Sequence, residues 1–274
     1  MKITKIVSKE NPVFKNTLKL KNSKKARDSN RVFLIEGLRL CEEAIKSEVK
    51  INSAFFTEFW YEKNTDFLSK LLKSEIDAYI LSESLFKKIS ETVNPQGVIF
   101  LCSKLSKNFF SELNNLFFKE SNLGVKILIL ENIKDPSNLG TILRTAETLG
   151  INRVILSENC CDIYNPKVLR GSMGSIFRLY FFISKNLPKT IIDLKEIFKI
   201  PVYATTLCEN SIPITKIKFP KKCAAVIGNE GNGLTKETTD VCSFKIKIPI
   251  SKNANSLNVS SATSIIIWEL IRER

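Results

Sequence analysis

Residues 128–150, LILENIKDPSNLGTILRTAETLG, carry two side chains whose types and spacing could do chemistry. Asn138 follows the turn-forming run Asp-Pro-Ser, and Arg144 lies six residues later. The turn predicts that Asn138 caps the amino end of a helix and that Arg144 sits within that helix. A guanidinium stays protonated, so Arg144 offers a permanent positive charge. A structural cap and an ordinary helix arginine are the alternative for this segment taken alone.

A second segment, VIGNEGNGLTKE at residues 226–237, follows an apolar strand with a glycine-rich turn. Its glycines, Gly228, Gly231 and Gly233, would let the backbone approach a ligand closely. The order GxxGxG is not the GxGxxG dinucleotide fingerprint, and there is no GK[ST] of a phosphate loop. Glu230 inside the turn favours a ligand with hydroxyl or ammonium donors over a phosphate. A tight strand-to-helix turn is the alternative.

A third segment, residues 246–270, places polar side chains immediately before an apolar helix. Ser256, Asn258 and Ser260 are interleaved with apolar residues in the run SLNVS. Capping of the helix explains one of these polar residues and not all three.

The chain has no histidine and seven cysteines, none in CxxC spacing. The missing histidine excludes histidine acid–base catalysis, His-containing triads and most transition-metal sites. The odd number of cysteines argues against a disulfide framework and a zinc site, and it indicates a reducing compartment. We therefore expect no metal, and a mechanism that uses Arg, Glu, Asn and Ser or a cofactor.

The net charge is +14, from 42 Lys and Arg against 28 Asp and Glu. Such a surface attracts polyanions, of which nucleic acid is the commonest, although a lysine-rich bias that serves only solubility is the alternative. The amino-terminal residues have no apolar core of signal-peptide length, and no stretch reaches the roughly 18 apolar residues of a membrane span. We expect a soluble, cytoplasmic protein with no membrane partner.

Residues 1–103 alternate strand-like and helix-like segments, which predicts a small α/β domain. A basic segment between residues 15 and 31 is either a solvated first helix or an arm that contacts RNA phosphates. The candidate phosphate contacts are Lys24, Lys25, Arg27 and Arg31. Residues 104–124 have apolar pairs at helical spacing and are expected to form a linker helix. Strands are expected at 32–37, 51–57, 78–82 and 97–103, and helices at 38–47 and 66–75.

Residues 125–274 are expected to form a doubly wound, mainly parallel α/β sheet. VKILIL at 125–130 is apolar but for one lysine, as expected of a strand buried on both faces. Each of the three polar segments follows a strand of this domain. Further strands are expected at 154–156, 202–205, 224–227 and 244–248, with helices at 141–149, around 166–174 and from about 260.

Taken in order, the three polar segments resemble the SpoU/TrmH family of the SPOUT methyltransferase superfamily. The matching motifs are Asn-x-x-x-x-x-Arg-Thr, Gly-Asn-Glu-Gly-x-Gly-Leu, and Ile-Pro followed by Ser-Leu-Asn-Val-Ser. NPKVLRGSMGSIFRLYF at 165–181 is also similar to this family, and the resemblance covers essentially all of residues 125–274. RVFLIEGLRLCEEAI at 31–45 and NPQGVIFL at 94–101 resemble, less specifically, the family's RNA-binding amino-terminal domain, whose fold is like that of certain ribosomal proteins.

This resemblance implies a carboxyl-terminal trefoil knot, a homodimer, and S-adenosylmethionine bound in loops of the second and third segments. Arg170 matches a recurring arginine that would contact RNA or support the fold. The positions that match catalytic motif residues are Asn138, Arg144, Glu230, Ser256 and Asn258. The positions that match cofactor contacts are Thr205, Thr206, Leu207, Gly228, Asn229, Gly231, Ile248, Ile250 and Leu257.

The reaction that the resemblance implies is attack of a ribose 2′-oxygen on the methyl group of a sulfonium. The family proposal makes Arg144 the base, but a guanidinium stays protonated. We prefer Arg144 as a charge that binds the adjacent phosphate and stabilises the developing alkoxide, with the proton passing to water or a phosphate oxygen. Asn138 would orient Arg144 or the ribose, and Ser256 and Asn258 would position the hydroxyl and the cofactor.

Two positions depart from the family's pattern. Lys252 stands where the family usually has Gly, and Asn255 stands where it usually has Glu. Both belong to the loop of the third segment and not to the catalytic positions. They therefore bear on the shape of that loop and on the target nucleotide, and not on the reaction class.

The expected substrate is 23S ribosomal RNA, because a separate amino-terminal RNA domain favours ribosomal over transfer RNA by analogy. A tRNA 2′-O-ribose methyltransferase is the first alternative. A catalytically silent RNA-binding or ribosome-assembly protein is the second, and the five intact catalytic positions argue against it. An enzyme that uses another nucleotide would need the GxGxxG or phosphate-loop signatures that the chain lacks.

Overall fold

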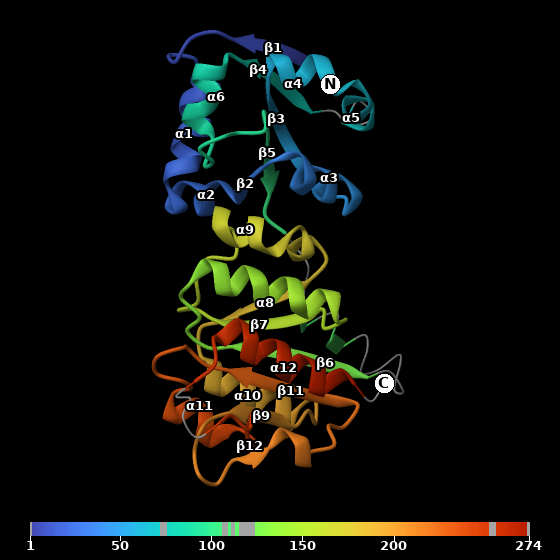
Figure 1. Ribbon diagram of the computed structural model, residues 1–274. Coiled ribbons are helices and arrows are strands. Elements are labelled where there is room, and N and C mark those ends of the chain that lie inside the picture. The colour runs from blue at the N-terminus through green and yellow to red at the C-terminus, as the bar shows by residue number, and fades with distance from the viewer. Residues whose placement is uncertain are drawn as a thin grey trace. The chain divides into compact units, whose positions relative to one another are not determined.

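The structure, a computed structural model, describes residues 2–71, 76–105, 109–110, 113–114, 124–251 and 256–272. The chain divides into two compact units, Met1–Ser106 and Lys107–Arg274 (Figure 1). The sequence analysis placed this division at residue 103. Most of the expected linker helix at 104–124 lies outside the described residues, and so do Lys252 and Asn255.

The first unit is built on a five-stranded sheet of order β1-β4-β3-β5-β2. Strand β5 is antiparallel to both of its neighbours, and the other pairs are parallel. The expected α/β alternation is found, but the expectations missed β1. The strands are β1 (Lys2–Ile6), β2 (Val32–Glu36), β3 (Ile51–Thr57), β4 (Asp77–Leu81) and β5 (Val98–Ser103). The helices are α1 (Pro12–Asn22), α2 (Lys24–Asn30), α3 (Leu38–Lys46), α4 (Glu58–Lys63), α5 (Thr65–Leu71) and α6 (Glu83–Ile89).

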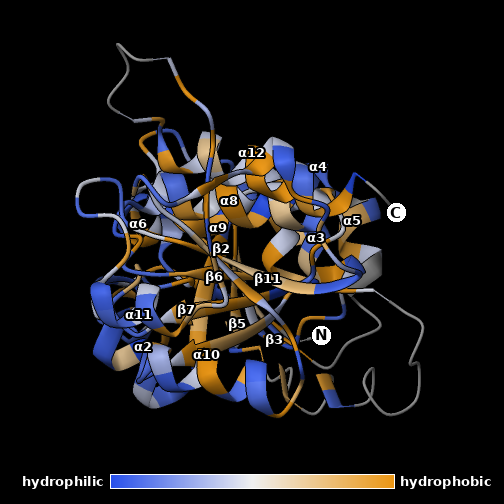
Figure 2. Cartoon of the chain, turned by 90° about the horizontal axis from the view of Figure 1, so that it is seen from below, coloured by the Kyte–Doolittle hydropathy of each residue, from blue (hydrophilic) through white to orange (hydrophobic). Residues whose placement is uncertain are grey.

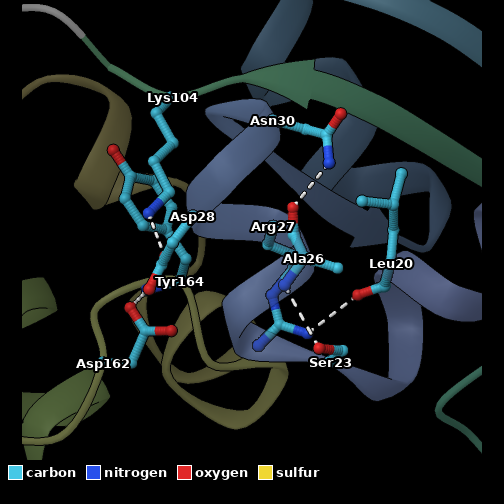
Figure 3. A network of polar contacts seen from close by, with 9 residues as sticks. All are labelled: Leu20, Ser23, Ala26, Arg27, Asp28, Asn30, Lys104, Asp162 and Tyr164. Carbon is cyan, nitrogen blue, oxygen red and sulfur yellow. Dashed lines mark hydrogen bonds and ion pairs between the residues drawn. The ribbon is translucent and has the colours of Figure 1, made fainter.

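The basic segment forms two helices, α1 and α2, joined by one arginine (Figure 3). The Nη1 of Arg27 donates to the backbone oxygens of Leu20 and Lys21, at 2.9 Å each. These carbonyls belong to the last turn of α1, where no intrahelical donor remains for them. Arg27 therefore holds α2 against the carboxyl end of α1. The side chain of Lys104 pairs with Asp28 of α2.

The second unit is built on a seven-stranded sheet of order β10-β12-β9-β11-β6-β7-β8, and all its described strand pairs are parallel. This confirms the expected α/β fold with a mainly parallel sheet. The strands are β6 (Val125–Leu130), β7 (Arg153–Ser157), β8 (Tyr180–Ser184), β9 (Val202–Thr205), β10 (Ile212–Pro213), β11 (Lys222–Ile227) and β12 (Phe244–Lys247). The α-helices are α8 (Pro136–Thr148), α9 (Pro166–Ser172), α10 (Leu187–Glu196), α11 (Lys236–Val241) and α12 (Val259–Ile271).

Apolar side chains fill both faces of the central strands of this sheet. All five residues of β7 are buried, as are all but the first of β11. Figure 2 colours most of β6 and β7 as hydrophobic. Helix α12 packs against α8 and over β11 and β6. The expectations missed β8, β10 and α10, and they started α8 five residues too late. No helix in the described ranges is long and apolar enough to cross a membrane.

The sheet order brings the three polar segments to one edge. Strands β12, β9, β11 and β6 are parallel neighbours, so their carboxyl ends meet at the same edge of the sheet. The residues that follow β6 lead into α8, those after β11 form the glycine-rich turn, and those after β12 lead into α12. The fold therefore gathers residues that are more than 100 positions apart in the chain.

Candidate active site

A cavity of about 690 Å³ lies at this edge of the sheet. Its walls come from the ends of β9, β11 and β12, the glycine-rich turn, and the start of α12. Glu230 and Ser256, expected as catalytic residues, also line it. The cavity brings together all nine residues that the sequence analysis assigned to the cofactor: Thr205, Thr206, Leu207, Gly228, Asn229, Gly231, Ile248, Ile250 and Leu257.

The glycine-rich turn is a tight hairpin that only glycine permits at its base. The backbones of Asn229 and Gly233 exchange two hydrogen bonds, at 3.1 and 2.9 Å. A Cβ on Gly228 would lie 2.3 Å from the carbonyl carbon of Gly233, closer than real Cβ contacts come. Gly233 itself has φ +66°, and no atom lies within 4 Å of where its Cβ would be. The hairpin therefore presents open backbone to the cavity.

Three catalytic candidates from three segments form one hydrogen-bonded chain. The Nδ2 of Asn138 donates to Glu230 Oε1 at 2.6 Å. The Nδ2 of Asn258 donates to Asn138 Oδ1 at 3.1 Å. The amide of Asn138 is thus held from both sides, which fixes its orientation beside the cavity.

The expectation that Asn138 caps its helix is wrong, because Asp135 caps α8. The Oδ1 of Asp135 accepts from the backbone N–H of Asn138 at 2.8 Å, and Pro136 occupies the first helical position. Proline is well suited to that position because its missing N–H has no partner there in any case. The side chain of Asn138 is consequently free to reach Glu230.

Asn258 both caps a helix and joins the site. Its Oδ1 accepts from the backbone N–H groups of Ser260 and Ser261 at the start of α12, at 2.9 and 3.4 Å. Its Nδ2 is left to bind Asn138. One side chain therefore ties the amino end of α12 to the amino end of α8.

Arg144 lies apart from the cavity. It is exposed on α8 and makes no hydrogen bond or ion pair with the residues that the structure describes. Six residues of α-helix separate it from Asn138, about 9 Å along the axis and on a different face. Within one polypeptide, the structure does not bring Arg144 to the hydrogen-bonded residues Glu230, Asn138 and Asn258.

The residues expected to contact RNA have unequal surroundings. Lys24, Lys25 and Arg31 are exposed on the first unit, whereas Arg27 is half-buried and bonded to α1. Arg170 lies in the last turn of α9, and its Nη1 is buried without a hydrogen-bond partner among the described residues. Arg27 is thus committed to the fold, and Lys24, Lys25 and Arg31 are free to meet solvent.

Sequence reasoning missed several cavity residues. Cys208, Thr239 and Lys247 line the cavity and add polar side chains to its wall. Lys247 ends β12 and lies next to two apolar lining residues, so strand alternation gave no signal for it. Thr239 lies in α11, one turn beyond the hairpin, where a polar residue on a short helix carries no distinctive pattern.

The lining suits S-adenosylmethionine, which carries an adenine, a ribose and an amino-acid group. Ile248, Ile250 and Leu257 offer apolar surface for a flat ring. The carboxylate of Glu230 can accept from hydroxyl or ammonium donors, and the open backbone of the hairpin allows close approach. The residues present therefore fit this cofactor.

Both halves of the chain match known families. Residues 126–268 match the SpoU rRNA Methylase family, and residues 11–99 match the MRM3-like substrate binding domain. The chain is 31% identical over 265 residues to the 23S rRNA (guanosine(2553)-2′-O)-methyltransferase RlmP of Bacillus subtilis, covering 97% of this chain and 98% of that protein.

Solved structures share the fold over nearly the whole chain. The AdoMet-bound rRNA methyltransferase from Sinorhizobium meliloti superposes with a TM-score of 0.85 at 26% identity, covering 99% of this chain and 98% of that one. The SpoU methyltransferase AviRb from Streptomyces viridochromogenes shares the fold with a TM-score of 0.81 at 21% identity, covering 96% and 98%. The family that the motifs predicted is confirmed by the match of residues 126–268. With more than half of its length matched by the family model, the chain belongs to the SpoU rRNA Methylase family.

Proposed function

We propose that this protein methylates a ribose 2′-hydroxyl of 23S ribosomal RNA, with S-adenosylmethionine as methyl donor. The predicted reaction class and cofactor are confirmed by the family and by relatives named for that activity. The observation that supports the proposal from this chain's own residues is that the three polar segments meet at one edge of the sheet. There the predicted cofactor residues line one cavity, and Glu230, Asn138 and Asn258 form a bonded chain beside it.

The cofactor, when bound, supplies a methyl group activated by its sulfonium. We assign Glu230 to hold donor groups of the cofactor, because its carboxylate lines the cavity. Asn138, fixed by Glu230 and Asn258, orients the ribose, and Ser256 positions the hydroxyl. Within one chain Arg144 stands apart from the cavity, so we assign this role to Arg144 of a second copy of the chain in the homodimer proposed below. There it would bind the adjacent phosphate and stabilise the developing alkoxide, while the proton passes to water or a phosphate oxygen.

We assign RNA binding to the first unit, through exposed basic residues at α2. Lys24 and Lys25 lie on that helix and Arg31 directly follows it. Each contact between a cation and a phosphate releases counterions. The double variant Lys24→Ala/Lys25→Ala should therefore raise the KM for RNA about tenfold at low salt and leave the Kd for S-adenosylmethionine unchanged. An unchanged KM in steady-state assays would place the RNA elsewhere. Lys9→Ala/Lys87→Ala, two exposed lysines outside the segment 15–31, is the control for loss of charge alone.

The proposed function is tested with tritiated S-adenosylmethionine and separate pools of unmodified 23S ribosomal RNA and transfer RNA. Digestion should yield a labelled 2′-O-methylated nucleoside from the ribosomal pool. Label found only in transfer RNA would show that transfer RNA, and not 23S ribosomal RNA, is the substrate. A base-methylated product would contradict the ribose assignment. Binding of cofactor without labelling of either RNA would support the catalytically silent alternative.

Three further properties complete the proposal. Exposed Trp268 and Ile265 lie three residues apart on α12, which supports a homodimer through that helix. The packing of α12 against α8, β11 and β6 is compatible with the trefoil knot implied by the resemblance. The seven free thiols are compatible with the cytoplasm.

Sedimentation equilibrium should give a mass of twice 31.1 kDa, and the mass of a single chain would contradict the dimer.

A further inference from the structure

Glu131, which directly follows β6, is a buried carboxylate outside the cavity lining. Its side chain is bonded to two threonines from a segment about 100 residues away. Its Oε1 accepts from the hydroxyls of Thr235 and Thr238, at 2.8 and 2.6 Å, and its Oε2 accepts from the backbone N–H of Thr235 at 2.8 Å. Only 4% of Glu131 is exposed, so these three donors replace the water that it loses on folding.

The two threonines lie where the glycine-rich hairpin ends. Thr235 caps α11 through its hydroxyl, which accepts from the backbone N–H of Thr238 at 3.3 Å. Residues 228–234, which line the cavity, come immediately before this cap. The carboxylate of Glu131 therefore fixes the point at which the hairpin returns to the fold.

The neighbouring residue, Asn132, fixes the beginning of the same hairpin. The Nδ2 of Asn229 donates to the backbone oxygen of Asn132 at 2.9 Å. The backbone N–H of Glu131 donates to the oxygen of Ile227, the last residue of β11, at 2.8 Å. Two consecutive residues after β6 thus hold both ends of the hairpin.

We propose that Glu131 is a positioning residue for the cofactor, which sets the shape of the hairpin by anchoring Thr235 and Thr238. This role rests on the proposed function and adds a residue to it. Glu131 does not touch the cavity, so it acts through the hairpin. Its effect belongs to cofactor binding and not to RNA binding, because the partners of its carboxylate, Thr235 and Thr238, lie in the second unit.

The bond from Thr238 to Glu131 lies in a buried environment. Thr238 is fully buried, and its backbone oxygen accepts from Cys242 Sγ at 3.1 Å. Burial raises the pKa of Cys242 to about 12; the charge of Glu131 raises it further and those of Lys195 and Lys245 lower it, so Cys242 remains a thiol. The thiol donates to the backbone oxygen of Thr238, so it is the hydroxyl of Thr238 and not this thiol that donates to the Glu131 carboxylate.

A matched pair of substitutions at Thr238 separates positioning from packing. Thr238→Val keeps the shape and loses the hydroxyl, whereas Thr238→Ser keeps the hydroxyl and loses a methyl group. Titration calorimetry with S-adenosylmethionine alone should show a Kd raised about tenfold in Thr238→Val and within about twofold of wild type in Thr238→Ser. Thermal unfolding of both variants, followed by circular dichroism, shows that each is folded at the temperature of the titration.

Glu131→Gln tests the other side of the same bonds. One glutamine oxygen can still accept from the hydroxyls, but its NH₂ would face the backbone N–H of Thr235, donor against donor. We expect the Kd for S-adenosylmethionine to rise by at least tenfold while the Kd for RNA, measured without cofactor, stays the same. Equal cofactor affinities in Thr238→Val and Thr238→Ser, or a normal affinity in Glu131→Gln, would overturn the role of Glu131. Absence of cofactor binding in the wild-type protein would instead overturn the proposed function itself.

Discussion

Arg144→Ala should lower the rate constant of methyl transfer by about 10² to 10³-fold, the usual cost of removing one group that stabilises developing negative charge. The Kd for S-adenosylmethionine should stay within about twofold of wild type, because Arg144 does not line the cavity. Single-turnover kinetics with 23S ribosomal RNA and calorimetry with the cofactor alone measure the two quantities separately.

Arg144→Lys is the matched control for this result. Lysine retains the positive charge but not the planar fork that binds a phosphate with two hydrogen bonds, so we expect a rate between those of wild type and alanine. Because Arg144 is exposed and has no polar partner among the described residues, neither change should lower the melting temperature appreciably. A rate near that of wild type in Arg144→Ala would remove Arg144 from the catalytic residues.

Gly228→Ala should weaken cofactor binding by about 100-fold or more, because the hairpin cannot close around an added methyl group. The new Cβ would lie 2.3 Å from the carbonyl carbon of Gly233 and 2.5 Å from the backbone nitrogen of Leu234. Both are backbone atoms, so the strain cannot be relieved by rotating a side chain. Calorimetry with S-adenosylmethionine, combined with thermal unfolding, measures the effect.

Gly231→Ala is the control within the same hairpin. Its added Cβ would meet nothing nearer than Asn229 Oδ1 at 3.5 Å, an ordinary contact. We expect the melting temperature to hold in Gly231→Ala, and its cofactor affinity to fall much less than in Gly228→Ala. Equal affinities in the two variants would show that the close approach of Gly228 to Gly233 does not govern the shape of the cavity.

Much of the second unit could be predicted from the sequence because its signals are local. The apolar run at β6 marks a strand buried on both faces, and turn residues mark the polar segments that follow β6, β11 and β12. The order of those segments was sufficient to identify the family. Strand β8 was missed because three of its residues are only half-buried and one is exposed, which blurs the pattern of a central strand.

The roles of individual polar residues depended on partners far away in the chain. Asp135 and Asn138 are both suitable helix caps, and local sequence does not choose between them. The choice follows from Glu230, 92 residues away, which takes the amide of Asn138 and leaves the cap to Asp135. Glu131 gave no signal either, because a single carboxylate after a strand is ordinarily interpreted as exposed. Its burial becomes evident only when the fold places Thr235 and Thr238 within hydrogen-bond distance of it.

The sequence by itself thus determined the reaction class, the cofactor and part of the cavity lining, because motif residues and their order are local properties. Only the tertiary structure decided which of them bond to one another and which stand apart, as Arg144 does. The physical reason is that a hydrogen bond requires atoms within about 3 Å, and for residues 92 and 120 positions apart that proximity is created by the parallel order of β12, β9, β11 and β6.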